Sequence, residues 1–545
     1  MNNTPDSNKQ QPEQPKSDPA VNSVDKSSNV TSSLFRSSAI VGVMTMISRF
    51  LGLARDVVLA NFFGATAGAD AFFVAFKIPN FFRRLFAEGA FAQAFIPVLA
   101  DYKQEQGTES VNRLLGSVAG VLGSVLFIFT LLAVLGAPWV TAVFAPGFLD
   151  EPEKYNLASE MLQITFPYLF LVSLTAFAGA VLNSYNNFAV PAFTPVLLNL
   201  CLIAAALFMT PLFSQPVVAL AWGVLIAGLV QFLFQLPFLL KLGLLPRPRL
   251  DYKHEGVKRI MTLMVPAMFG VSVSQINLLL DTILASLLQT GSVSWLYYSD
   301  RLVELPLGVF GIAIATVILP SLSAKSSSKS EQAFSDTIDW ALKMVLLIGL
   351  PAALALVVLA EPLITVLFHY GALTDFDVLQ AAKSLRAYAL GLLAFMLVKV
   401  LAPGFFARQD MKTPVKVGIY AMIANMVLNL IFIWPLQHAG LALATAVSSW
   451  CNALCLLWLL RKENIYRASA GWGLFALRLT AASVVMLVCV YGLNAPIEQW
   501  FAWGVVDRIQ QIALLVVVGI SAYFGALMLL GSNLRRFIRA KGDSA

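Results

Sequence analysis

The amino-acid sequence predicts an all-α integral membrane protein with 14 transmembrane helices, arranged as two parallel six-helix repeats around a central cavity plus two C-terminal helices. Three observations lead to this fold class. The 545 residues are 58% hydrophobic and only 12% charged, whereas a soluble globular protein carries about 25% charged residues. The apolar residues form runs of about 20, the length of helix that crosses a roughly 30 Å hydrocarbon core. The sequence also matches itself at a nearly constant offset.

The apolar runs define the helices in chain order. We expect the 14 helices near residues 35–62, 69–100, 112–145, 157–183, 191–212, 217–241, 258–289, 293–322, 336–369, 378–406, 413–435, 440–461, 472–493 and 509–531.

The two ends of the chain differ from its middle. Residues 1–33 contain almost no large apolar side chains, which predicts a disordered cytoplasmic tail. Residues 532–545 form a second, basic cytoplasmic tail. Lys and Arg are concentrated in alternate connecting segments, and the other segments are nearly free of them apart from Lys154 and Arg508. The positive-inside rule then places both termini in the cytoplasm, which requires an even number of spans.

The repeat is visible as four sequence matches in the same order. The segment from Leu135, LGAPWVTAVFAPGF, matches the segment from Leu359, LAEPLITVLFHYGA, and the four pairs lie 221 to 224 positions apart. We therefore expect two six-helix lobes, at 34–244 and 256–462, with the two helices of 472–531 outside the repeat. Because six is even, the two lobes run parallel, and rocking them about a central cavity would give alternating access.

The composition argues against an enzyme. The four cysteines lie inside apolar runs and the three histidines are scattered, so we expect neither a metal centre built from cysteine and histidine nor a disulfide framework. A membrane glycosyltransferase would need a sizeable extramembrane domain or acidic metal ligands in a loop, and a scaffold would give no reason for charges inside the helices. We expect a transporter without catalytic activity and without a nucleic-acid partner.

Charged residues inside the predicted helices are the candidates for a substrate site, because such charges are costly and usually functional. The basic groups outnumber plausible acidic partners, so we expect cations that face an anionic ligand, and arginine forks suit phosphate. Interfacial or mutually neutralising pairs, such as Arg84 with Glu88, are the alternative. The candidate substrate-binding residues are Arg49, Arg55, Asp70, Lys77, Arg83, Glu88, Arg301 and Lys399.

A second group of polar residues offers ligands for a small cation. Asp281 lies in the predicted helix 258–289, Asn425 and Asn429 lie four residues apart on one face of the next, and Thr445 follows. Carboxylate, amide and hydroxyl oxygens are hard ligands suited to such an ion. Ordinary hydrogen bonding between helices is the alternative.

Four long motifs carry a family resemblance: SRFLGLARD, DAFFVAFKIPNFFRRLFAEGAFAQAFIP, GSVSWLYYSDRL and KVLAPGFFARQDMKTPVK. From about Ser37 to the C-terminus the chain resembles the MurJ (MviN) family of lipid II flippases. The resemblance implies the fold of the multidrug/oligosaccharidyl-lipid/polysaccharide (MOP) exporter superfamily. It also implies cavity arginines at Arg49, Arg55, Arg83 and Arg301, and a helix aspartate at Asp70.

The resemblance extends to the remaining candidates. It implies that helices 472–531 form a groove for a polyprenyl tail. Some family members bind sodium, with a ligand pattern similar to Asp281, Asn425 and Thr445, and Asn429 stands where such a member has aspartate.

The expected function follows from the resemblance and the basic cavity together. We expect a monomer that flips lipid II, an undecaprenyl-diphosphate-linked disaccharide pentapeptide, from the cytoplasmic to the periplasmic leaflet of the bacterial inner membrane. We expect no cofactor, with sodium or the membrane potential as driving force. The alternatives are a flippase for another polyprenyl-diphosphate-linked glycan and a cation-coupled multidrug antiporter, for which an acidic cavity would be expected.

Overall fold

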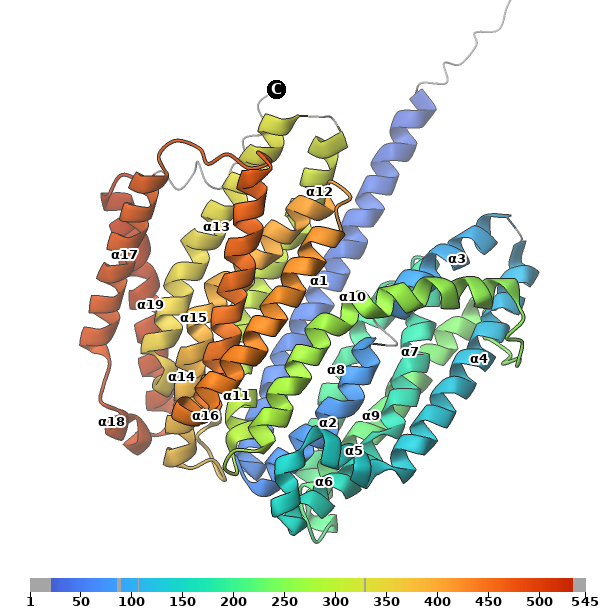
Figure 1. Ribbon diagram of the computed structural model, residues 1–545, viewed down its shortest axis with the longest axis horizontal. Helices are drawn as coiled ribbons and strands as arrows, with labels where there is room; N and C mark the ends of the chain where they lie inside the picture. Colours follow the sequence, from blue (N-terminus) through green and yellow to red (C-terminus); the bar gives the residue numbers. More distant parts are fainter. Residues whose placement is uncertain (1–20, 86–89, 106, 328–329, 533–545) are drawn as a thin grey trace, which may run out of the picture.

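The computed structural model describes residues 21–85, 90–105, 107–327 and 330–532. Within these residues every regular element is helical (Figure 1), which confirms the all-α fold class. The helices are α1 (Val21–Phe63), α2 (Ala67–Arg83), α3 (Phe91–Glu105), α4 (Gly107–Leu135), α5 (Ala137–Phe144), α6 (Pro152–Thr165), α7 (Pro167–Ser184), α8 (Ala189–Ala204), α9 (Val218–Lys241), α10 (Glu255–Ser286), α11 (Ser292–Pro306), α12 (Ile312–Ser327), α13 (Glu331–Val358), α14 (Ala360–Phe368), α15 (Asp375–Phe406), α16 (Lys412–Lys462), α17 (Trp472–Leu493), α18 (Ile497–Ala502) and α19 (Val505–Leu529).

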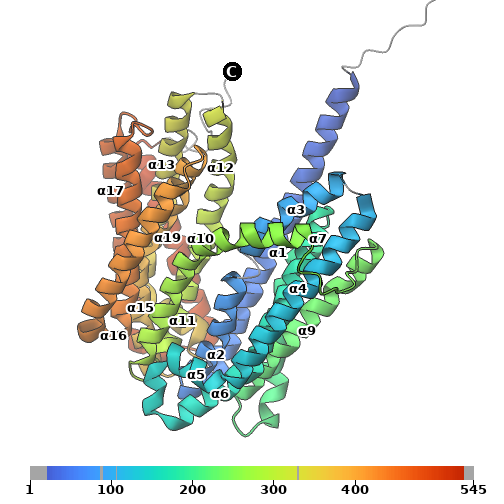
Figure 2. The ribbon, with the colours of Figure 1, turned by 45° about the vertical axis from the view of Figure 1, so that its right-hand side comes forward.

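The helices form two lobes (Figures 1 and 2). Helices α1 to α9 make the N-terminal lobe and α10 to α16 the C-terminal lobe, with α17 and α19 on the outer side of the latter, where α17 packs on α13. Helix α10 crosses between the lobes, because it packs against α2, α3 and α4 on one side and against α11 and α16 on the other. A proline, Pro266, lies inside α10, where it removes a backbone hydrogen bond and favours a bend.

Each helix that the sequence predicts coincides with a helix of the structure, although several are divided. The predicted helix 69–100 corresponds to α2 and α3, and 112–145 to α4 and α5. Nine helical segments of the described residues are long and apolar enough to cross a membrane. One of them, α16, has 51 residues, which is more than twice the roughly 20 needed for one crossing. Its backbone leaves the helical conformation at Gln437, between the predicted helices 413–435 and 440–461.

The N-terminal end corrects one prediction. Helix α1 begins at Val21, so the part of the predicted disordered tail from 21 to 33 is helical. A helix that has already been nucleated by its apolar part extends into polar residues at little cost, because each added residue gains one backbone hydrogen bond. Residues 1–20 of that tail, and residues 533–545 of the predicted basic C-terminal tail, lie outside the described residues.

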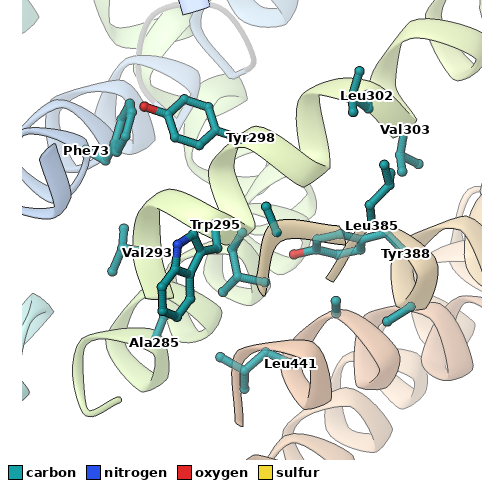
Figure 3. Close-up of a cluster of buried hydrophobic side chains, with 14 of the residues drawn as sticks. Phe73, Ala285, Val293, Trp295, Tyr298, Leu302, Val303, Leu385, Tyr388 and Leu441 are labelled. Atoms are coloured by element: carbon teal, nitrogen blue, oxygen red, sulfur yellow. The ribbon is translucent and has the colours of Figure 1, made fainter. Parts of the chain in front are cut away.

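Helix α11 is held in the buried core between the lobes. Figure 3 shows Tyr298 of α11 beside Phe73 of α2, and Trp295 turned toward Ala285 of α10. The rings of Phe73 and Tyr298 meet edge to face with centroids 5.8 Å apart, a favourable aromatic geometry. The motif that contains these aromatic residues therefore packs against both lobes, and this fixes the direction of its polar face.

Candidate functional site

The two lobes meet at the end of the molecule opposite the first turn of α1 and the last turn of α19, which we call the joined end (Figure 1). Asp70, in the first turn of α2, caps the first turn of α11 across the lobe boundary. Its carboxylate accepts hydrogen bonds from the backbone N–H of Gly291 at 2.7 Å, from the backbone N–H of Ser294 at 2.9 Å and from the Ser294 hydroxyl at 2.6 Å. A carboxylate at a helix N-terminus binds unpaired N–H groups and opposes the helix dipole. Asp70 therefore fastens one lobe to the other.

A buried lysine completes this contact. Lys154, which is only 4% exposed, lies with its ammonium 3.4 Å from the Asp70 carboxylate and donates a hydrogen bond to Thr290 across the boundary. It is also 3.5 Å from Glu151. Because both ions of the Asp70–Lys154 pair are buried, removing either deprives the other of a buried counter-charge.

Backbone contacts close the rest of the joined end. The backbone N–H of Ala372 donates to the carbonyl oxygen of Asn61, and the Tyr298 hydroxyl donates to the carbonyl oxygen of Gly64. Gly64 and Gly371 both have positive φ, and a Cβ on either would clash with backbone of the other lobe. Only glycine avoids both penalties, so the two turns approach more closely than other residues would allow.

Between the lobes, a carboxylate holds two of the predicted arginines together. Arg55 donates to Asp56 Oδ1 through Nε at 2.9 Å and Nη2 at 2.6 Å. Arg301 of the other lobe approaches Asp56 Oδ2 at 3.4 Å. The Tyr297 hydroxyl donates to Asp56 at 2.8 Å and accepts from Arg55 at 2.9 Å. We call Arg55, Asp56, Tyr297 and Arg301 the arginine cluster.

The cluster corrects the expectation that Arg55 is an unpaired cation. Arg55 is 6% exposed and fully partnered, with Asn199 as a further acceptor. The side chain of Arg301 is 33% exposed, and its second carboxylate partner, Glu304, is 47% exposed. An exposed pair of this kind contributes little free energy, about 0–1 kcal/mol, so Arg301 can exchange Glu304 for another anion at small cost.

The other predicted residues lie at different distances from the cluster. The guanidinium of Arg49 occupies the space beside Gly308 of the C-terminal lobe, where a Cβ would clash with it. Arg83 donates from Nε to Asn80 on its own helix. Lys77 lies within electrostatic range of Asp281, Asp300 and Arg301.

Two predicted residues are not brought into the cluster. Lys399 on α15 is exposed, and no ion pair joins it to a residue that the structure describes. Glu88 lies outside the described residues.

The predicted cation ligands do come together, as a hydrogen-bonded network. Asp281 accepts from the Asn429 amide at 2.7 Å and from the Thr445 hydroxyl at 3.2 Å. The same Asn429 amide nitrogen donates to Asn425 at 2.9 Å, while the Asn429 side-chain oxygen is buried without a hydrogen-bond partner. Rotating this amide by half a turn would bring its oxygen beside Oδ1 of Asp281 and Oδ1 of Asn425, with the Thr445 hydroxyl at the other Asp281 oxygen. The residues therefore fit a small cation only in that rotated state.

The comparisons with known proteins now decide the family. Residues 59–510 match the family model described as lipid II flippase MurJ. A Vibrio cholerae protein named probable lipid II flippase MurJ is 50% identical over 513 residues, covering 93% of this chain and 98% of its own length. This chain belongs to the MurJ family.

Further comparisons agree with that assignment. A Burkholderia cenocepacia protein named lipid II flippase MurJ is 42% identical, with 93% of this chain and 99% of that protein covered. A solved structure of lipid II flippase MurJ in an inward closed conformation has a TM-score of 0.77 at 27% identity and covers 92% of this chain and 100% of that one. A MATE family transporter of the MOP superfamily in an inward-facing conformation has a TM-score of 0.64 at 15% identity, covering 78% of this chain and 98% of that one. The chain is thus a multi-pass integral membrane protein of the MurJ family with the MOP fold.

Several residues of this MurJ family site were not predicted from the sequence. Ser294, Tyr297 and Arg301 lie three and four residues apart, so helical periodicity places them on one face of α11, but only the charged residue was selected. Lys154 was noted only as an exception to the charge pattern of the connecting segments.

Proposed function

We propose that this protein flips lipid II from the cytoplasmic to the periplasmic leaflet by alternating access. The observation that carries the proposal is the arginine cluster between the lobes of a MurJ family member. Relatives at 42% and 50% identity over nearly their whole length are named as lipid II flippases or probable ones. The diphosphate of lipid II is an anion that the fork-shaped guanidinium of arginine binds in bidentate fashion.

The arginine cluster suggests how the headgroup is held. Arg301 is the exposed member, so the diphosphate would replace Glu304 as its partner first. Arg55 and Asp56 are buried and hydrogen-bonded to Tyr297, which keeps the shared carboxylate from rotating toward the substrate. Arg49 and Arg83 would meet the phosphates on the entry path. Bound diphosphate would draw basic groups of both lobes together, while the joined end must separate for release.

We infer the topology from the same features. The protein lies in the bacterial inner membrane with 14 spans and both termini in the cytoplasm, as the charge pattern of its connecting segments predicts. Two parallel repeats are supported by the boundaries of the helices: α4 ends at Leu135 before the short α5, and α13 ends at Val358 before the short α14. This spacing falls within the offset of 221 to 224 positions seen in the sequence. Helices α17 and α19 would guide the polyprenyl tail, and the working unit is a monomer.

The driving force belongs to this proposal too. The network at Asp281 supports a weak sodium site that forms only when the Asn429 amide turns over. Lys77 interacts with both Asp281 and Arg301, so a cation at Asp281 would weaken the hold of Asp281 on Lys77 and favour its contact with the substrate phosphates. The membrane potential would contribute about 2.3 kcal/mol per elementary charge per 100 mV.

The experiment is a replacement in living cells. The native lipid II flippase of a bacterium is depleted, this chain is supplied, and labelled lipid II exposed on the periplasmic leaflet is measured. We expect restored exposure with the wild-type chain and with Arg408→Ala, an exposed arginine outside the cluster, but not with Arg301→Ala. Normal membrane expression without restoration would favour a flippase for another polyprenyl-diphosphate-linked glycan.

The antiporter alternative has less support. The likeness to MATE transporters, at 15% identity, reflects the fold alone. A cavity for cationic drugs would be expected to present carboxylates, whereas Asp56 here is already occupied by two arginines.

A further inference from the structure

The outer face of the N-terminal lobe carries an apolar groove that shares no residue with the arginine cluster. It lies among α4, α7 and α9 and has a volume of about 810 Å³, within the range of about 300–1,000 Å³ typical of ligand sites. Its walls are almost entirely apolar and include Gly123, Phe127, Phe170, Phe232 and Leu236. Phe127 is 57% exposed, so the groove opens outward, toward what would be lipid.

A basic pocket of about 440 Å³ adjoins the groove at one end. Arg113, Arg247 and Arg249 line it, together with Glu109. Glu109 is 3.6 Å from Arg113, so these two charges largely offset each other. Arg247 and Arg249 are exposed and have no carboxylate within ion-pair distance among the described residues. Because Leu245 lines both cavities, the pocket lies next to the groove.

The segment that carries these two arginines is the connection between the lobes. Residues 242–254, which we call the strap, join α9 to α10. The strap is fixed to α4, because the backbone N–H of Arg249 donates to the carbonyl oxygen of Gly116 at 2.9 Å. A Cβ on Gly116 or Gly120 would clash with carbonyl oxygens of Arg247 and Arg249. The two glycines thus let the strap lie directly on α4 at the mouth of the groove.

The composition of the strap suits the edge of a membrane. Pro246 and Pro248 also line the groove, and proline has no backbone N–H that would need a partner. The two prolines alternate with Arg247 and Arg249 along the strap. The prolines line the apolar groove, and the two arginines line the adjoining basic pocket. Basic pockets between transmembrane helices on the cytoplasmic side are a recurring form of anionic-lipid site.

We propose that the groove and the basic pocket bind one anionic glycerophospholipid. Its acyl chains lie among α4, α7 and α9, and its phosphate is bound by Arg247 and Arg249. The positive charge of the pocket favours a lipid with a net negative headgroup. A zwitterionic headgroup would bring its own cation into the pocket, where Arg247 and Arg249 would repel it. The bound lipid holds the strap, and with it the start of α10, on the N-terminal lobe. This inference does not depend on the substrate that the protein carries.

The test is native mass spectrometry of the purified full chain in detergent, with phosphatidylglycerol and phosphatidylcholine of identical acyl chains added in turn. We expect one phosphatidylglycerol to be retained at least about tenfold more strongly than phosphatidylcholine, the effect of a single strong ionic contact. Arg247→Gln/Arg249→Gln should remove this preference. The matched control, Arg408→Gln/Arg467→Gln, removes two exposed arginines of the C-terminal lobe and should keep it.

A second pair of variants tests the apolar part. A Cβ on Gly123 would meet only open space, so Gly123→Phe fills the groove without disturbing α4 and should lower retention of both lipids. Gly525→Phe in α19 is the matched control, because that glycine also faces open space. Equal retention of the two lipids by the wild-type chain would overturn the proposal, and so would unchanged retention after Arg247→Gln/Arg249→Gln.

Discussion

Asp70 should hold the joined end shut, and its removal should open that end. The carboxylate accepts three hydrogen bonds from the first turn of α11 and lies beside Lys154. Breaking a buried ion pair costs about 3–5 kcal/mol. We take the lower end for Asp70→Ala, because Lys154 keeps Glu151 and Thr290 as partners. At 1.4 kcal/mol per factor of ten, the equilibrium shifts toward separated lobes by about a hundredfold.

The assay measures the distance between the lobes directly. Spin labels at Glu153 of α6 and Leu287, just after α10, both exposed, report the joined end in a chain whose four cysteines are replaced by serine. Double electron–electron resonance should show a second, longer distance in Asp70→Ala.

Asp377→Asn is the matched control. Asp377 is also a buried helix-capping carboxylate, but its partners Thr374 and Trp295 lie within its own lobe. An unchanged distance distribution in Asp70→Ala, or an equal change in Asp377→Asn, would refute the reasoning.

Three further predictions follow from the described contacts. Asn429→Asp places a second carboxylate beside Asp281, so transport should become dependent on sodium, measured as the rate of flipping with sodium against choline. Burial, aided by Arg508, lowers the pKa of His369, so the folded protein binds fewer protons than the unfolded chain. Stability should therefore fall as the pH drops below about 6.5, and thermal unfolding of His369→Gln should show a weaker pH dependence. Gly371→Val forces a β-branched residue into positive φ at about 1–2 kcal/mol, so the same spin labels should show partly separated lobes.

The positions of the helices could be predicted from the sequence because each needs only a local apolar run. The start of α1 could not, since Val21 begins a helix within residues whose composition is typical of disorder. The break at Gln437 fell where two helices were expected, because Pro435 precedes it and proline disfavours a continuing helix.

The partners of charged groups were harder to predict. Asp56 directly follows Arg55 in the sequence, but its contact with Arg301 depends on how the lobes pack. Lys154 and Arg508 were exceptions to the charge pattern, and the structure gives the reason. Both side chains are buried, with exposed fractions of 4% for Lys154 and 6% for Arg508. Arg508 donates to the carbonyl oxygens of His369, Trp500 and Phe501. The positive-inside rule concerns Lys and Arg in the segments that connect the spans. A cation that is buried with fixed partners therefore carries little information about membrane orientation.

The grouping of the polar residues around Asp281 could be predicted from residue types, but the orientation of their side chains could not. Asp281, Asn425, Asn429 and Thr445 were expected to gather, and they do. The direction of the Asn429 amide, which decides whether the group offers oxygen or N–H to a cation, depends on local hydrogen bonds that no spacing rule contains. The packing of the strap on α4 was not predicted either. The need for glycine at 116 and 120 follows only from the strap backbone that lies against them.

The central claim is that the arginine cluster carries the diphosphate of lipid II across the membrane. The most direct measurement uses the purified chain in liposomes that contain fluorescent lipid II, with a membrane-impermeant quencher added outside. The account predicts that the wild-type chain and Arg408→Ala make the inner-leaflet lipid II available to the quencher, and that Arg301→Ala does so no faster than protein-free liposomes. Equal rates for the wild-type chain and Arg301→Ala would contradict it.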